Sequence, residues 1–190
     1  RIRVGGHRGV ENILLPAFDA LGMPYIPSSS LRGVARNYAI REIMKNQGLA
    51  WQQAEKEIAP YFGSIKTDNK ANQMGKIVFF DAYPKEGCLE MDMANNIWNW
   101  DGNNLKYSPN PNPFLSLKDA TFVIGLRLAS NCQDKAILEK VKSWLIKGLS
   151  EGVGAQINSG YGQLKESKTK IEFADKFFTM DFLLKGQLIH

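Results

Sequence analysis

Residues 152–162 of the chain, Gly-Val-Gly-Ala-Gln-Ile-Asn-Ser-Gly-Tyr-Gly, combine four glycines with neutral hydrogen-bonding side chains. Glycine permits positive φ angles and lets main-chain N–H groups approach a ligand closely. Several such groups form a concavity that binds an anion without any charged side chain. The alternative is a helix C-cap followed by an ordinary turn. The candidate ligand groups are Gly152, Gly154, the side chains of Gln156, Asn158 and Ser159, and Tyr161, whose ring offers a flat face to a base.

Two common phosphate-binding loops do not fit this segment. A dinucleotide-binding GxGxxG loop requires glycine where Ile157 stands, and it precedes a helix, whereas residues 152–162 follow a predicted helix. A P-loop requires Gly-Lys followed by Ser or Thr, and this tripeptide is absent. Any anion bound here must therefore be held in another way.

A second candidate site is the start of a helix predicted over residues 31–45. The serines at positions 28–30 supply N-cap hydroxyls, and a helix start presents free N–H groups and the positive end of its dipole. Arg32 and Arg36 are four residues apart and share one face of this helix. Ser29, Ser30, Arg32 and Arg36 are therefore candidate contacts for a phosphodiester. A well-capped helix with merely solvated arginines is an equally simple interpretation.

Positive charge is concentrated near the beginning of the chain. Residues 1–45 contain seven Arg or Lys residues and three acids, while the whole chain has a net charge of +5. His7 and Arg8 lie in a short glycine-rich stretch and are further candidate phosphate contacts. The chain has one other histidine, His190, so His7 is the natural candidate if the protein uses a general acid or base.

The sequence predicts no cofactor, metal site or membrane segment. Cys88 and Cys132 belong to no CxxC or Cys/His pattern, which excludes a disulfide scaffold and suits a reducing cytoplasm. No apolar run approaches the roughly 20 residues that span a bilayer. We expect a cytoplasmic protein without a membrane partner.

The elements that must position these sites follow an α+β pattern. Alternation, proline and capping signals predict strand, helix, strand, strand, helix, strand, which is the βαββαβ order of a ferredoxin-like (RRM-like) fold. The predicted strands are 1–4, 76–83, 88–93 (as partner of 76–83), 120–129 and 163–170, with helices at 31–45, 51–58 and 134–148, a long insertion or loop at about 94–119, and an extra strand or hairpin at about 177–189.

Two of these segments resemble signatures of the RAMP superfamily of type III CRISPR systems. Residues 24–36 are similar to the family pattern PYIPGSSLKGxxR, and residues 148–162 are similar to GLxxxGVGAKTxxGYG. The chain departs from these patterns at Ser28, where the family has glycine, at Arg32, where it has lysine, and at Gln156-Ile157, where it has Lys-Thr. The loop therefore lacks its usual lysine and hydroxyl.

The resemblance implies a single RAMP domain over residues 1–190, with its core in about 1–60, 76–93 and 120–170. The segment from residue 177 resembles the opening strand of a RAMP domain, and so could begin a further unit. The resemblance further implies a non-catalytic, RNA-binding backbone subunit of a type III-B (Cmr) effector complex in antiviral defence. Its partners would be CRISPR guide RNA, target RNA and other RAMP subunits.

Three alternatives remain at this point. The chain could be a RAMP endoribonuclease that uses His7, a target-cleaving backbone subunit that uses Asp19, or a ferredoxin-like scaffold without affinity for RNA. Asp81 lies in a strand-like run and is expected to be structural. Trp98 and Trp100 are expected either to contact a neighbouring subunit or to cover the core of this domain.

Overall fold

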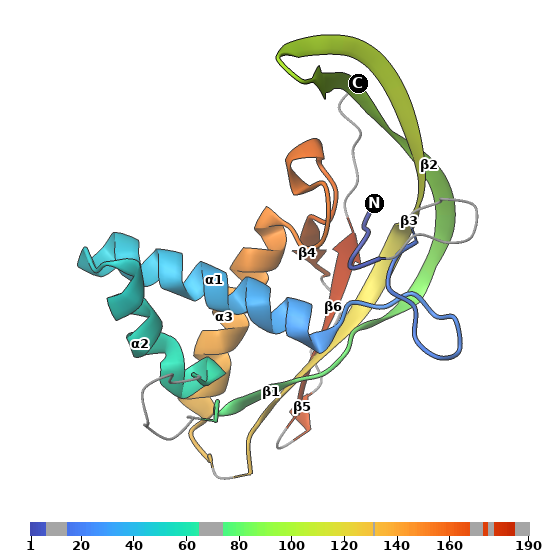
Figure 1. Cartoon of the computed structure of the whole chain (residues 1–190). Helices are drawn as coiled ribbons and strands as arrows, with labels where there is room; N and C mark the ends of the chain where they lie inside the picture. The colour runs from blue at the N-terminus through green and yellow to red at the C-terminus, as the bar shows by residue number, and fades with distance from the viewer. Residues whose placement is uncertain (7–14, 65–73, 131, 168–172, 175–176, 185–190) are drawn as a thin grey trace.

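The computed structural model describes residues 1–6, 15–64, 74–130, 132–167, 173–174 and 177–184, without the side chains of residues 95–101, 108–110 and 173–184. Three helices form one layer against an antiparallel sheet, and a long two-stranded arm extends from that sheet (Figure 1). The predicted α+β class is confirmed. His7, Arg8 and His190 lie outside the described residues.

Helix α1 (Ser28–Gln47) begins three residues before the predicted start. The carbonyl of Pro27 accepts hydrogen bonds from the N–H groups of Ser30 and Leu31, so the serines themselves form the first turn. Gly48, with a φ of 67°, ends the helix in the left-handed conformation that glycine adopts at low cost.

Helices α2 (Trp51–Phe62) and α3 (Lys135–Glu151) complete the layer. α2 continues past its predicted end at residue 58 and through Pro60, because a proline in the last turn removes only one helical hydrogen bond. Asp134, the first residue of the helix predicted over 134–148, caps α3, and its carboxylate accepts a hydrogen bond from the N–H of Ala136 at 2.9 Å. Gly148 lets α3 approach α1 closely, since a Cβ there would lie 2.7 Å from a methyl of Val34.

The sheet contains β1 (Ile77–Phe79), β2 (Tyr83–Asp101), β3 (Asn104–Leu128), β4 (Leu164–Glu166), β5 (Phe173–Ala174) and β6 (Phe177–Leu184). Its main order is β1-β3-β6-β4, while β2 pairs with β3 and β5 pairs with β6, and every pairing is antiparallel. The predicted pairing of residues 76–83 with 88–93 is wrong, because both segments pair with β3.

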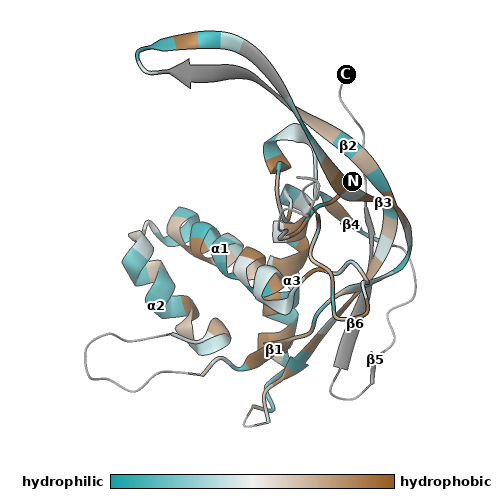
Figure 2. Ribbon diagram, turned by 45° about the vertical axis from the view of Figure 1, so that its right-hand side comes forward, coloured by the Kyte–Doolittle hydropathy of each residue, from teal (hydrophilic) through white to brown (hydrophobic). Residues whose placement is uncertain are grey.

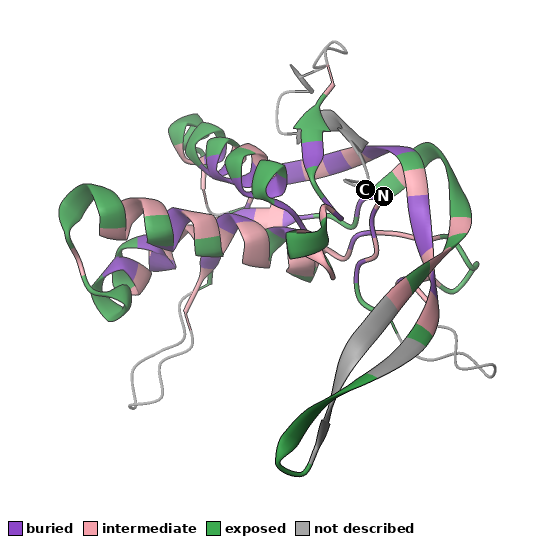
Figure 3. Ribbon diagram, turned by 90° about the horizontal axis from the view of Figure 1, so that it is seen from above, coloured by how far each residue is buried: buried purple, intermediate pink, exposed green. Residues whose placement is uncertain are grey.

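The expected loop within residues 94–119 is also wrong. β2 and β3 form one continuous hairpin arm that turns at Gly102, whose φ is 62° (Figure 1). Pro111 and Pro113 lie inside β3 opposite Asn95 and Met93. Leu89, Met91 and Met93 alternate along β2 and are 42–60% exposed, so one side of the arm presents apolar groups to solvent. Much of the arm is exposed (Figure 3).

The strand expected at the N-terminus makes only one bridge with the sheet. Ile2 pairs with Leu117 of β3 through two backbone hydrogen bonds of 2.9 Å. Thr121, four residues after Leu117 on the same edge of β3, pairs with Leu183 of β6. β6 therefore occupies the strand position between β3 and β4, and the expected extra strand is present over Phe177–Leu184.

The hydrophobic core lies between the three helices and one face of the sheet, where apolar side chains meet (Figure 2). Trp144 is its largest fully buried member, and its indole Nε1–H donates to the carboxylate of Glu42 at 2.6 Å. Fully buried residues of the three helices, β3 and β4 include Leu31, Ile40, Ile58, Phe122, Ile124, Leu126, Leu145 and Leu164. The opposite face of the sheet has no helix among the described residues (Figure 1).

Candidate nucleic-acid interface

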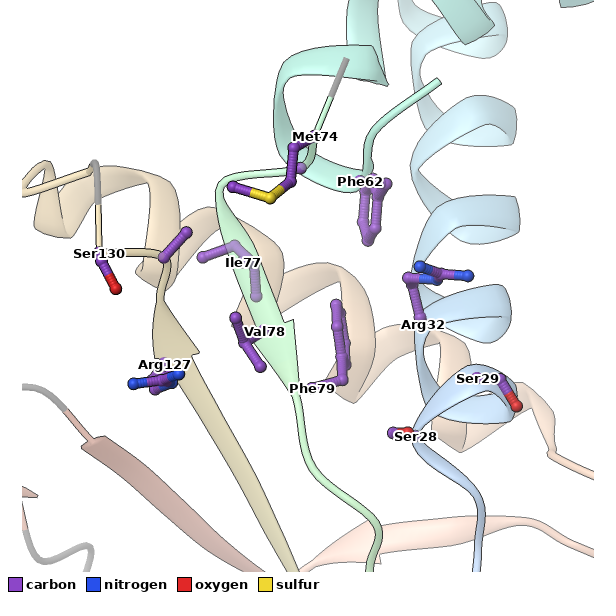
Figure 4. A pocket seen from close by; sticks show the side chains of 12 residues that line it. Ser28, Ser29, Arg32, Phe62, Met74, Ile77, Val78, Phe79, Arg127 and Ser130 are labelled. Carbon is purple, nitrogen blue, oxygen red and sulfur yellow. The ribbon is translucent and has the colours of Figure 1, made fainter. Parts of the chain in front are cut away.

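An open groove of about 510 Å³ lies where the first turn of α1 meets the edge strand β1. Ser28, Ser29 and Arg32 form its wall on α1, and the side chains of β1 form its floor (Figure 4). Arg127 of β3 lines it on the far side of β1 (Figure 4). Among the described residues, the two charged side chains that line the groove are both arginines. Its charge therefore suits an anion.

The head of α1 is fixed to the sheet by Asp81. The N–H of Ser28 donates to the Asp81 carboxylate at 2.6 Å, so the acid satisfies one of the free amides at the helix start. A negative charge at this end of a helix is also favoured by the helix dipole. The expected structural role of Asp81 is confirmed. Ser29 remains exposed on the groove side, whereas Ser30 is half-buried.

The two predicted arginines of α1 have different surroundings. Arg32 is exposed and lines the groove. Arg36 is half-buried and forms an ion pair with Glu55 of α2, so its charge is neutralised within the protein. Helical spacing places Arg32 and Arg36 on one face, but only Arg32 lines the groove.

The glycine-rich loop is not the open main-chain cradle that the sequence predicts. The N–H of Ala155 donates to the carbonyl of Arg3 at 2.9 Å, and the N–H of Gly162 donates to the carbonyl of Arg1 at 2.7 Å. Gly154, with a φ of 92°, has no room for a side chain, because a Cβ would lie 2.3 Å from the Arg3 carbonyl oxygen. The close approach that glycine permits here is used by the chain's own N-terminal segment.

Tyr161 is also used within the protein, and the expectation that its ring faces a base is wrong. The residue is 8% exposed, its hydroxyl donates to the Asp92 carboxylate, and Phe114 lies edge-on to the ring. Burial, together with this hydrogen bond and the Asp92 charge, raises the pKa of Tyr161 to about 12. The ring anchors the loop to the arm.

The remaining predicted groups of the loop differ in exposure. Asn158 and Ser159 are exposed, whereas Gly152 is buried against Ile157. Gln156 has a left-handed φ of 60°, and its buried side-chain oxygen has no hydrogen-bond partner among the residues that the structure describes. None of the predicted loop residues lines the groove. In Figures 1 and 2 the loop after α3 and the strand β1 lie at opposite ends of the helical layer.

Asp19, the candidate catalytic acid, shapes a turn. Its carboxylate oxygen Oδ1 accepts hydrogen bonds from the N–H groups of Leu21 and Met23 at 2.9 and 2.8 Å.

In the part of the chain that the structure covers, no group of three His, Cys, Asp or Glu residues is placed to hold a metal ion. Within the same part, no helix is both long and apolar enough to cross a bilayer.

Arg127 is the groove residue that the sequence did not point to. It pairs with Val78 of β1, and its guanidinium carbon lies 5.9 Å from the centre of the Phe80 ring. A lone arginine in the alternating run of residues 120–129 gives a weak signal, because strands commonly place such side chains in solvent. Only the register between β1 and β3 brings it to the groove.

Comparison with known proteins places these observations in a family. Residues 1–165 match the family model of the RAMP superfamily. The CRISPR system Cmr subunit Cmr6 of Pyrococcus furiosus is 26% identical over an alignment 231 residues long. This alignment covers 87% of this chain and 65% of that protein. The chain therefore spans about two thirds of the length of this curated relative.

Two solved structures are also similar. A chain in the cryo-EM structure of the type III-B Cmr-beta bound to cognate target RNA matches with a TM-score of 0.61 and 21% identity, over 97% of this chain and 57% of that one. The crystal structure of Cmr6 from Pyrococcus furiosus matches with a TM-score of 0.45 and 24% identity, over 77% and 84%. The first of these matches supports the fold.

Proposed function

The chain belongs to the RAMP superfamily, and from this we propose that it is an RNA-binding subunit of a type III-B CRISPR effector complex. In this proposal the subunit holds guide RNA by its ribose–phosphate backbone and does not cleave it. The resemblance to the sixth Cmr subunit supports the assignment to type III-B. The proposed ferredoxin-like topology is supported by the antiparallel order β4-β6-β3-β1, with β6 in the row of the opening strand.

The observation that carries the proposal is the groove at the start of α1, where the charged lining residues that the structure describes are Arg32 and Arg127. Arg32 projects from the first turn of the helix, beside the exposed Ser29. Arginine pairs with phosphate through a planar fork of donors, and helix starts favour anions. The groove is therefore suited to a phosphodiester.

Contacts of this type recognise the backbone of RNA and leave its bases free to pair with a target. Binding should depend strongly on salt, because each phosphate that is neutralised releases condensed counterions. It should depend little on base sequence at the Arg32 contact.

The proposal that the subunit is non-catalytic is supported by the surroundings of Asp19. Its Oδ1 oxygen is committed to two backbone N–H groups, which gives this acid a role in shaping its turn. Guide RNA, target RNA and other RAMP subunits are the proposed partners. The exposed apolar side chains along β2 support contact with another subunit. The proposed location is the cytoplasm.

The test is binding and cleavage of CRISPR repeat RNA by the purified protein. Salt-dependent binding without cleavage is the expected result. Binding should weaken in Arg32→Ala but not in Lys45→Ala, which removes an exposed charge from the other end of α1. Cleavage that disappears in His7→Ala would instead establish the RAMP endoribonuclease. Cleavage that disappears in Asp19→Ala would establish the target-cleaving backbone subunit. Failure to bind RNA at low salt would refute the proposal.

A further inference from the structure

Phe80 lies across the face of the sheet that is opposite the helices. Its N–H donates to the carbonyl of Gly125 in β3 at 3.1 Å, and a Cβ on Gly125 would lie 3.2 Å from the Phe80 ring. A glycine within a strand normally weakens the strand, so a close approach is the usual reason for its presence. Here it makes room for an aromatic ring that remains 38% exposed.

A second aromatic group stands beside it on the same face. Tyr83 faces Val123 in the register of β2 and β3, and it is 40% exposed. Its ring stacks on Tyr25, with centroids 5.7 Å apart and an interplanar angle of 18°. Tyr25 is held there because Ile26 and Ala82 exchange two backbone hydrogen bonds of 2.9 Å.

Alternation along the strands shows that these side chains share the open face. Phe79, Ala82, Ile124 and Leu126 are buried in the core between helices and sheet. In β3, Ile124 and Leu126 face the core, so Val123, Gly125 and Arg127 face the other side, because successive side chains of a strand alternate. The Phe80 ring lies against Gly125 and Tyr83 is paired with Val123, which places both on this open face. The resulting open-face platform consists of Tyr25, Phe80, Tyr83 and Arg127, and the Arg127 guanidinium lies over the Phe80 ring.

We propose that this open-face platform stacks unpaired bases of single-stranded RNA. Aromatic rings and arginine planes exposed on a sheet are suited to splayed bases, and each stacked base contributes about 1–3 kcal/mol in such sites. The proposal extends the function inferred above, which concerns the phosphate groove, by adding a surface that contacts bases.

Charge favours RNA over an apolar protein surface as the occupant. Arg127 is half-buried and lines the open groove. Covering this cation with an apolar surface would be costly, whereas a phosphate in the groove would pair with its guanidinium. The carboxylates of Asp19 and Asp81 lie close enough to Tyr83 to interact with it electrostatically. Both carboxylates already accept hydrogen bonds from backbone N–H groups.

The groove connects the platform to the phosphate site. Its lining includes Arg32 on the helix side of β1 and Arg127 on the other side (Figure 4). A single strand held at Arg32 can therefore pass around the short edge strand β1 and reach Arg127 and Phe80. This path places backbone contacts and base contacts at different points of one ligand.

The experiment compares two single-stranded RNA probes of about 12 nucleotides, a length within the range of known single-strand sites. One probe carries its bases, and the other has the same ribose–phosphate backbone with abasic positions. Affinity for both is measured by fluorescence anisotropy for the wild type, Phe80→Leu, Tyr83→Leu and Arg32→Ala. Trp51→Leu is the matched control, since Trp51 is 44% exposed at the start of α2.

Phe80→Leu and Tyr83→Leu should each weaken binding of the base-containing probe about tenfold, equivalent to about 1.4 kcal/mol. They should leave binding of the abasic probe unchanged. Quenching of 2-aminopurine placed in the base-containing probe should also be lost. Trp51→Leu should change none of these values, and thermal unfolding should show that each variant is folded.

The outcomes separate this proposal from the preceding one. If Arg32→Ala weakens both probes but the aromatic variants weaken neither, the platform is refuted and the phosphate groove stands. If the aromatic variants weaken both probes equally, base stacking is refuted. If Arg32→Ala has no effect while the aromatic variants remain selective for bases, the phosphate groove fails and the platform stands. Loss of a co-purifying protein in Phe80→Leu with unchanged RNA affinity would show that the face binds protein, and would overturn the inference.

Discussion

The carboxylate of Asp81 and the backbone N–H of Ser28 are 2.6 Å apart, and this hydrogen bond joins the segment between β1 and β2 to the first residue of α1. It places a negative charge near a groove whose described charged lining residues are Arg32 and Arg127. The same acid therefore stabilises the helix start and opposes the binding of an anion there.

Asp81→Asn should tighten RNA binding about two- to threefold, since the amide keeps a hydrogen-bond acceptor but loses the charge. Stability should fall by no more than about 1 kcal/mol, the usual size of a helix-capping contribution. RNA titrations and urea unfolding of the same samples check both effects. Weaker binding in the folded variant would show that Asp81 assists the ligand.

Arg32→Ala should weaken RNA binding by a similar factor for all base sequences and reduce the salt dependence by about one phosphate contact. Arg36→Ala should have a smaller effect on binding, because its guanidinium is paired with Glu55. A partly exposed ion pair of this kind contributes about 0–1 kcal/mol to stability. Titrations at several salt concentrations distinguish the two, and equal effects would contradict the separation of these arginines.

Gly154→Val should destabilise the fold by at least about 1–3 kcal/mol, because its φ of 92° is strained for a β-branched residue and its Cβ would meet the Arg3 carbonyl. RNA binding should fall only as far as the folded fraction falls. The matched control is Gly33→Ala in α1, where no atom lies within 4 Å of the new Cβ and about 0.5–1 kcal/mol should be gained. Lost binding with unchanged stability in Gly154→Val would restore the loop as a ligand site.

Glu42→Gln should reduce stability at neutral pH and change it little in acid. A hydrogen bond from Lys147, supported by one from Trp144, holds the pKa of Glu42 below its ordinary value despite partial burial. Because the folded pKa is depressed, this stabilisation is present above the unfolded pKa of about 4.3 and is lost as pH falls through the folded value. Chemical unfolding at pH 7 and pH 3 should show a difference of about 1–2 kcal/mol only at pH 7. A difference that persists at pH 3 would contradict the charge argument.

The helices were predictable because their signals are local. Asp134 marks the start of α3, and apolar residues recur at helical spacing after it. The hairpin arm was missed for the complementary reason. Asn, Pro and Gly within residues 94–113 are typical of loops, and nothing local shows that Asn96 will face Asn110 across a ladder. The pairing of the two strands across the hairpin, and not the preference of each residue, decided this element.

The candidate sites show the same limit at the level of side chains. The sequence indicates that Gly154 needs space, but it does not show that the carbonyl of Arg3 takes that space. Helical spacing places Arg36 beside Arg32, but Glu55 on another helix neutralises one of them. Arg127 and Gly125 gain their roles only from the register with β1, which brings Phe80 across the sheet.

The position of β6 has a consequence for synthesis on the ribosome. β6 lies in the interior of the sheet between β3 and β4, yet it comes after both of them in the chain and is the last of the described strands. Until residue 184 has left the exit tunnel, β3 and β4 have no common neighbour and keep two open edges. The individual helices and the hairpin arm can form from contacts that are close in sequence, whereas closure of the sheet must wait until β6 has been made. A nascent chain stalled before β6 should therefore depend on a chaperone more than a chain that includes β6.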